Sequence, residues 1–182
     1  MRQIKINSVT GSDTSIVPTS EMKNYLRVDH SVDDSLIADM VKQSRIVLEN
    51  YISRDIVSKT RTYYLDKSNG LIDIPFGPIA SIESVTVDGS TATHTVVGLD
   101  KESIELDSSP SYVSSNQFPY TYEKIKINYT TSGISDTLIK NAIMQMVATF
   151  YDNRADFKTG HIISEIPMTS KQMVASFKSM FV

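Results

Sequence analysis

The 182-residue chain contains no cysteine and only seven glycines. Without cysteine there is no disulfide framework, no thiolate nucleophile and no thiolate metal site, which fits synthesis in a reducing cytoplasm. The few glycines form no phosphate-binding loop, no Rossmann fingerprint and no G-x-S-x-G nucleophile elbow. The familiar sequence signatures of an enzyme are therefore missing, and we predict a protein that is not an enzyme and uses no cofactor.

A strong excess of charge and long apolar runs are absent as well. The net charge of −3 lacks the basic footprint of a protein that reads a nucleic-acid sequence. No apolar run is long enough to span a bilayer, and the first residues lack the apolar core of a signal peptide. We therefore expect a soluble protein that has no membrane partner and is long enough for one domain with a real core.

Two stretches show the apolar spacing of amphipathic helices. Residues 31–52 and 134–153 carry apolar side chains at i, i+3, i+4 and i+7. Ser31 and Asp34 have the spacing of a capping box at the start of the first stretch, and Ser135 is the expected N-cap of the second. These two helices are predicted to pack against each other through their apolar stripes.

Between the two long helices the apolar period changes to the alternation of β-strands. Residues 56–130 are rich in Val, Ile, Thr and Tyr, and Asp88-Gly89 is a strong hairpin signal. The predicted fold class is therefore α+β, with a helical framework that holds a β-rich insertion. Residues 1–157 are expected to form a single domain, whose framework also includes a short helix at residues 18–27.

The remaining residues, 158–182, are predicted to form a linker and a C-terminal helix. One face of this helix collects apolar and adaptable side chains that either fold onto the protein's own core or bind a partner. These side chains are Met173, Val174, Phe177, Met180 and Phe181.

An acidic cluster leaves a further interpretation open. Asp29, His30, Asp33 and Asp34 include the residue types of a divalent metal site or a general acid–base pair. The spacing matches no common ligand pattern, however, and two aspartates before a helix also complement its dipole. A small metal-dependent enzyme is therefore kept only as a third alternative, and no metal ligand is assigned.

Three segments carry a recognisable pattern: PTSEMKNYLRVDHSVDDSLIADMVKQSRIVLENYISRDI, IDIPFGPIASIESVTVDG and IKINYTTSGISDTLIKNAIMQMVATFYDNRADF. Together they resemble the head–tail connector family of tailed bacteriophages, whose members are also called adaptor or head completion proteins. The similarity covers residues 18–157 in the order found in the family. Residues 107–121 and those after 157 match no part of the pattern, and Thr131-Ser132-Gly133 stands where the family often has Gly-Tyr.

The resemblance implies a structural virion protein that is made in the host cytoplasm. Such a protein forms a homo-oligomeric ring, commonly a dodecamer, which docks beneath the portal protein at the capsid vertex. The ring extends the channel through which double-stranded DNA passes without sequence-specific binding, and it meets a downstream neck, stopper or tail protein. A tail-completion or stopper protein of the phage neck is the alternative.

Within this interpretation, we predict two sets of contact residues. The C-terminal side chains named above, Met173, Val174, Phe177, Met180 and Phe181, are the expected portal contacts. A cyclic ring also needs two complementary side surfaces on each subunit, and charged residues of the long helices are the expected source. These residues are Lys42, Arg45, Glu49, Lys140, Asp152 and Arg154.

Overall fold

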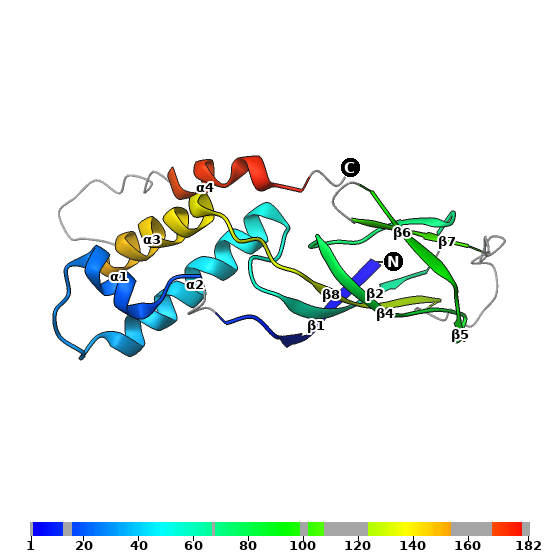
Figure 1. Cartoon of the computed structure of the whole chain (residues 1–182), viewed down its shortest axis with the longest axis horizontal. Coiled ribbons are helices and arrows are strands. Elements are labelled where there is room, and N and C mark those ends of the chain that lie inside the picture. The colour runs from blue at the N-terminus through cyan, green and yellow to red at the C-terminus, as the bar shows by residue number, and fades with distance from the viewer. Residues whose placement is uncertain are drawn as a thin grey trace. The chain divides into compact units, whose positions relative to one another are not determined.

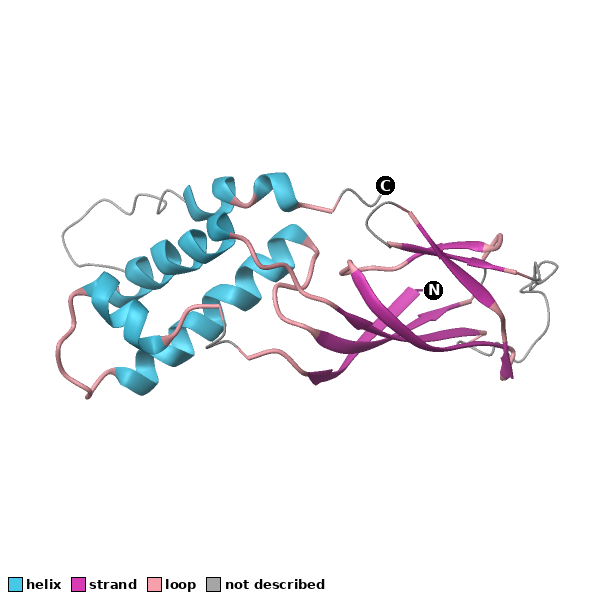
Figure 2. Cartoon of the chain, viewed as in Figure 1, coloured by secondary structure: helices cyan, strands magenta, loops and turns pink. Residues whose placement is uncertain are grey.

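The computed structural model describes residues 2–12, 16–66, 68–98, 102–107, 124–153 and 169–179. They form two compact units (Figure 1). The first unit comprises Val57–Ile134 together with the N-terminal stretch that ends at Gly11, and the second comprises Ser12–Ile56 and Ser135–Ser179. The strands belong to the first unit and the long helices to the second (Figure 2). Within the described residues, no helix has both the length and the apolar character needed to cross a membrane.

The β unit contains two antiparallel sheets. The larger sheet has five strands in the order β1-β2-β8-β4-β5. Their bounds are Arg2–Val9 (β1), Lys59–Leu65 (β2), Ile125–Thr131 (β8), Ile79–Val87 (β4) and Ser90–Thr91 (β5). The smaller sheet has the order β3-β7-β6, with bounds Leu71–Asp73 (β3), Ser103–Leu106 (β7) and His94–Val97 (β6).

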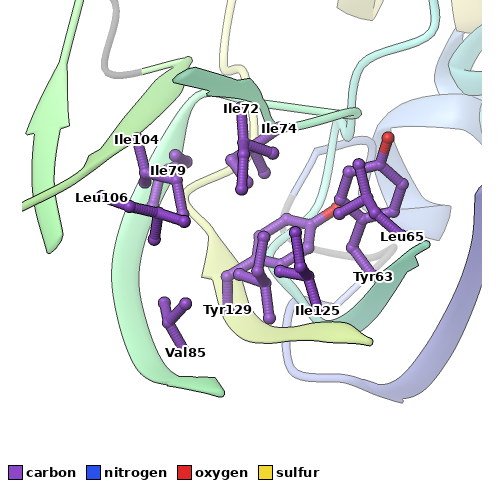
Figure 3. Close-up of a cluster of buried hydrophobic side chains, with 11 residues drawn as sticks. Tyr63, Leu65, Ile72, Ile74, Ile79, Val85, Ile104, Leu106, Ile125 and Tyr129 are labelled. Atoms are coloured by element: carbon purple, nitrogen blue, oxygen red, sulfur yellow. The ribbon is translucent and has the colours of Figure 1, made fainter. Parts of the chain in front are cut away.

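An apolar core joins the two sheets of this unit (Figure 3). Successive residues of β8 alternate between buried and half-buried, because neighbouring side chains of a strand point to opposite faces. Burial raises the pKa of the Tyr63 hydroxyl, while the Arg2 guanidinium opposes this rise and the Asp73 carboxylate adds to it. The core cluster consists of Tyr63, Leu65, Ile72, Ile74, Ile79, Val85, Ile104, Leu106, Ile125, Ile127 and Tyr129.

The predicted hairpin at Asp88-Gly89 forms, but its return strand is short. Asp88 and Gly89 have φ values of 48° and 80°, the positive values that a tight turn of this kind requires. Ser90–Thr91 pairs back onto β4, and the N–H of Ala92 donates one further hydrogen bond of 2.9 Å to the carbonyl of Val85. The chain then passes to β6, which pairs with β7 in the smaller sheet. One hairpin signal therefore marks the point where the chain changes sheets.

The helical unit is built around two long helices, α2 (Asp34–Ile52) and α3 (Thr137–Asp152), which pack against each other. Their predicted caps differ from the observed ones. Asp33 is the N-cap residue of α2, and the N–H of Asp34 binds the backbone carbonyl of Ser31 at 3.2 Å. Asp136, rather than Ser135, caps α3, because its Oδ1 accepts a hydrogen bond of 2.7 Å from the N–H of Leu138. The shorter elements of the unit are α1 (Thr19–Leu26), α4 (Thr169–Met173) and the 3-10 turn η2 (Ala175–Phe177).

The predicted fold class, a helical framework that holds a β-rich insertion, is wrong. The strands form a unit of two antiparallel sheets with its own buried core. This unit also recruits β1 from before the first helix, so it is not confined to the segment between the long helices. The physical reason is that the apolar side chains on the facing sides of the two sheets pack against each other and bury enough surface to form a separate core. The architecture is mixed, and sheets form a large part of it.

Candidate assembly surfaces

The C-terminal segment, residues 169–179, packs on its own helical unit. Helix α4 contacts α3, and the N–H of Ser179 donates a hydrogen bond of 2.9 Å to the carbonyl of Ile52 at the end of α2. Val174 is fully buried, whereas Met173 and Phe177 are half-buried. The remaining predicted portal contacts, Met180 and Phe181, lie outside the described residues. Of the predicted set, Met173 and Phe177 therefore offer accessible apolar surface.

Two lysines of this segment hold it over an aromatic ring. The Nζ atoms of Lys171 and Lys178 lie 5.7 and 5.4 Å from the centroid of the Tyr51 ring, near the end of α2. Both distances are within the range in which a cation is attracted to the face of a ring. The contacts that fix the segment thus include the buried side chain of Val174, the backbone hydrogen bond of Ser179, a side-chain hydrogen bond from Thr169 to Gln145 and two cation–π contacts.

Two of the predicted ring contacts are buried inside the helical unit. Arg45 and Glu49 are each only 3% exposed, and the Arg45 Nη1 lies 2.5 Å from the Glu49 Oε2. The other carboxylate oxygen of Glu49 accepts a hydrogen bond of 2.9 Å from the backbone N–H of Ile56. The pair therefore joins the last turns of α2 to the chain that follows the helix.

The other predicted ring contacts are more accessible. Lys42 is exposed and lines a shallow depression of about 220 Å³. Lys140 is half-buried and forms a 2.7 Å ion pair with Glu21 of α1, while Asp152 is exposed at the end of α3. Arg154 lies outside the described residues. The depression is lined by Ser12, Val17, Thr19, Ala38, Asp39, Val41 and Lys42.

The acidic cluster contributes to helix packing. The Tyr151 hydroxyl donates a hydrogen bond of 2.5 Å to the Asp33 carboxylate, and the Lys23 ammonium lies 2.7 Å from the Asp34 carboxylate. Asp29 and His30 are exposed in the turn before α2. No group of three or more potential metal ligands comes together in the part of the chain that the structure describes. Two of the four residues thus have structural partners within the helical unit.

A row of polar side chains that the sequence patterns did not predict crosses four strands of the larger sheet. The amide of Asn7 donates to the Thr62 hydroxyl at 2.7 Å, which donates to the Asn128 carbonyl oxygen at 2.7 Å. The Asn128 amide then donates to the Ser84 hydroxyl at 2.8 Å. All four side chains are uncharged and bind one another, so the row itself is hydrophilic and carries no charge. Its sequence signal is the alternation in β2 and β8, which identifies the residues but not their pairing.

No protein-family model matches the chain, and no curated protein matches it. Solved structures do show a similar fold over nearly the whole length. The chain aligns with a chain in the neck of an empty gene transfer agent (GTA) particle computed with C6 symmetry, with a TM-score of 0.72, 16% identity and coverage of 99% of this chain and 97% of the other. A chain from the virion of a native GTA particle gives a TM-score of 0.73, 15% identity and the same coverages.

A third similar chain comes from the neck of a native GTA particle computed with C12 symmetry, with a TM-score of 0.69 and 15% identity. The alignment covers 98% of this chain and 97% of that one. At such low identity, the comparison establishes a shared fold. The alignment extends over both units.

Proposed function

We propose that this chain is a structural protein of a phage-like neck, where it forms a ring beneath the portal protein and extends the DNA channel toward the next neck or tail component. The observation that carries the proposal is the nearly full-length fold similarity to chains of GTA neck structures computed with C6 and C12 symmetry. The connector-like segments within residues 18–157 point the same way.

The charge of the chain supports a role as a conduit. A ring through which DNA moves should bind the phosphate backbone weakly. Each phosphate that a basic side chain neutralises releases counterions and so strengthens binding. A net charge of −3 and an uncharged polar row across the larger sheet both suit this requirement. The proposed role needs no catalytic group and no cofactor.

The C-terminal segment is the proposed portal contact. Phe177 and Met173 carry accessible apolar surface next to the buried anchor Val174. The accessible charged residues Lys42, Lys140 and Asp152 are the proposed contacts between neighbouring subunits. Arg45 and Glu49 are buried, and their proposed role is to stabilise the end of α2. A cyclic ring uses two different surfaces of each subunit, which separate groups of residues supply.

Replacing Phe177 with serine is expected to weaken portal binding at least about tenfold, because aromatic side chains dominate the energy of such contacts. The measurement is co-sedimentation of the chain with its cognate portal. Tyr25→Ser is the matched control, since Tyr25 is an exposed aromatic residue of α1 in the same unit. Unchanged binding by Phe177→Ser would refute the portal contact, and no binding by the natural chain would favour a stopper or tail-completion role.

A further inference from the structure

Strand β1 forms an open and unusually exposed edge of the larger sheet. It pairs with β2 alone among the described strands, and all eight of its residues are exposed. Three of them are large apolar residues, Ile4, Ile6 and Val9, with exposed fractions of 38%, 48% and 51%. A long edge with exposed apolar side chains is a template for pairing with another chain, and monomeric proteins usually protect such edges.

The apolar side chains of β1 continue the core face of the sheet. Ile4 lies opposite Tyr63 in β2, and Tyr63 lies opposite Ile127 in β8. Tyr63 and Ile127 belong to the buried core, whereas Ile4 at the end of this row is exposed. The pairing of β1 with β2 is regular from Arg2 to Ile6, and the register shifts only between Ile6 and Ser8. An apolar, regularly paired row therefore ends at the edge with an exposed isoleucine.

The opposite edge of the same sheet is open over part of its length. Strand β4 has nine residues, of which Thr86 and Val87 pair with β5 and Val85 accepts a backbone hydrogen bond of 2.9 Å from the N–H of Ala92. Ala80, Ser81 and Glu83 are exposed along the remainder. Among the described strands, the edges of the smaller sheet are much shorter, with three residues in β3 and four in β6.

The two long edges also differ in charge. Strand β1 carries two cations, Arg2 and Lys5, and no acidic residue, whereas the only charged residue of β4 is Glu83. Opposite charges on facing strands favour pairing, and like charges disfavour it. This pattern favours contact between unlike edges over contact of β1 with a second β1.

We propose that β1 of one subunit pairs with the open edge of β4 in a second copy of this chain, so that the larger sheet continues from subunit to subunit. The proposal rests on the proposed ring function. Contact between unlike edges is a heterologous interface, the type that a ring requires and that closes when the rotation between subunits permits. Pairing of two β1 strands about a twofold axis stops at a dimer. Main-chain hydrogen bonds between the two strands would supply affinity, and burial of the Ile4 and Ile6 side chains by the neighbouring subunit would supply specificity.

Cysteine cross-linking tests this joint cleanly because the natural chain contains no cysteine. Within one subunit, β1 and β4 are separated by β2 and β8, about 14 Å at the usual strand spacing, which is beyond disulfide reach. Lys5→Cys is combined in turn with Ser81→Cys or Ser84→Cys, because the strand register places these residues on one face and both serines lie outside the part of β4 that pairs with β5. The two pairs cover two registers of the proposed contact.

The variants are assembled on the portal, oxidised mildly and separated on a non-reducing gel. We expect at least one pair to give a ladder of covalent oligomers. Lys5→Cys alone and Lys5→Cys with Thr95→Cys, which is on β6 of the smaller sheet, should give none. The absence of a ladder from both pairs on sedimenting portal complexes would overturn the edge contact and leave the neck function intact. Dimers from Lys5→Cys alone would overturn it in favour of twofold pairing.

A second variant tests the same joint without cysteine. Ile6→Lys places a charge at the proposed contact and should lower the assembled fraction at least about tenfold, since an inward charge on an edge strand blocks further pairing. Val96→Lys, at an exposed apolar position of β6, is the matched control and should assemble normally. Normal assembly of Ile6→Lys would contradict the inference. If the natural chain does not bind the portal, the proposed ring function is refuted. Cross-linking of the concentrated chain without portal then tests the edge contact by itself. A ladder of oligomers supports the contact, and the absence of a ladder overturns it.

Discussion

Replacing Glu49 with alanine is expected to lower the free energy of unfolding of the helical unit by about 3–5 kcal/mol, the cost of breaking a buried ion pair. The substitution leaves the buried Arg45 guanidinium without its 2.5 Å partner and removes the acceptor of the Ile56 N–H. Both losses destabilise the fold for the same reason: a buried charge or hydrogen-bond donor that loses an interaction still bears the cost of its desolvation. Urea unfolding followed by far-ultraviolet circular dichroism measures the change.

The control for this prediction is the ion pair between Lys140 and Glu21. Both of its side chains are partly exposed, at 33% and 42%, so Glu21→Ala should cost no more than about 1 kcal/mol. Similar losses from Glu49→Ala and Glu21→Ala would contradict the structural role assigned to the buried pair. They would also return Arg45 and Glu49 to the set of candidate surface contacts.

Replacing Ile127 with alanine is expected to cost about 2–5 kcal/mol, because it deletes fully buried methyl and methylene groups from the core of the β unit. Ile127 lies in β8, the central strand of the larger sheet, opposite Tyr63 of β2 on one side and Val85 of β4 on the other. The loss should appear in urea unfolding followed by tyrosine fluorescence, since Tyr63 packs in the same core.

Ile4→Ala is the matched control for this second prediction. Ile4 stands in the same cross-strand row as Ile127, but it is exposed at the edge. Its truncation should therefore change the stability of the isolated chain by less than about 0.5 kcal/mol. Equal effects of the two substitutions would show that the β unit lacks the independent core described here.

The sequence predicts the long helices well because their signal is local. The apolar spacing in α2 and α3 corresponds to buried residues such as Ile37, Leu48 and Ile143. The sequence does not distinguish the N-cap of α3, because Ser135 and Asp136 are both residue types that cap helices well. The backbone geometry selects Asp136. The C-terminal helix is shorter than predicted, because α4 ends at Met173 and a 3-10 turn follows.

The remaining features depend on contacts between residues far apart in the chain. The pairing of β1 with β2 joins residues more than fifty positions apart, and no local pattern encodes it. Arg45 and Glu49 appear on the polar side of a helical projection, yet each neutralises the other and both are buried. The row from Asn7 to Ser84 depends on the register of four strands. Such partnerships follow from the fold, so composition and periodicity alone could not supply them.

Electron microscopy of the chain mixed with its cognate portal protein tests the central claim most directly. We expect a closed ring of this chain that caps the portal and continues its channel. The C-terminal segment should contact the portal, and adjacent subunits should contact each other through β1 and β4. A folded chain that leaves an intact portal bare, or that binds it without forming a ring, would contradict the account.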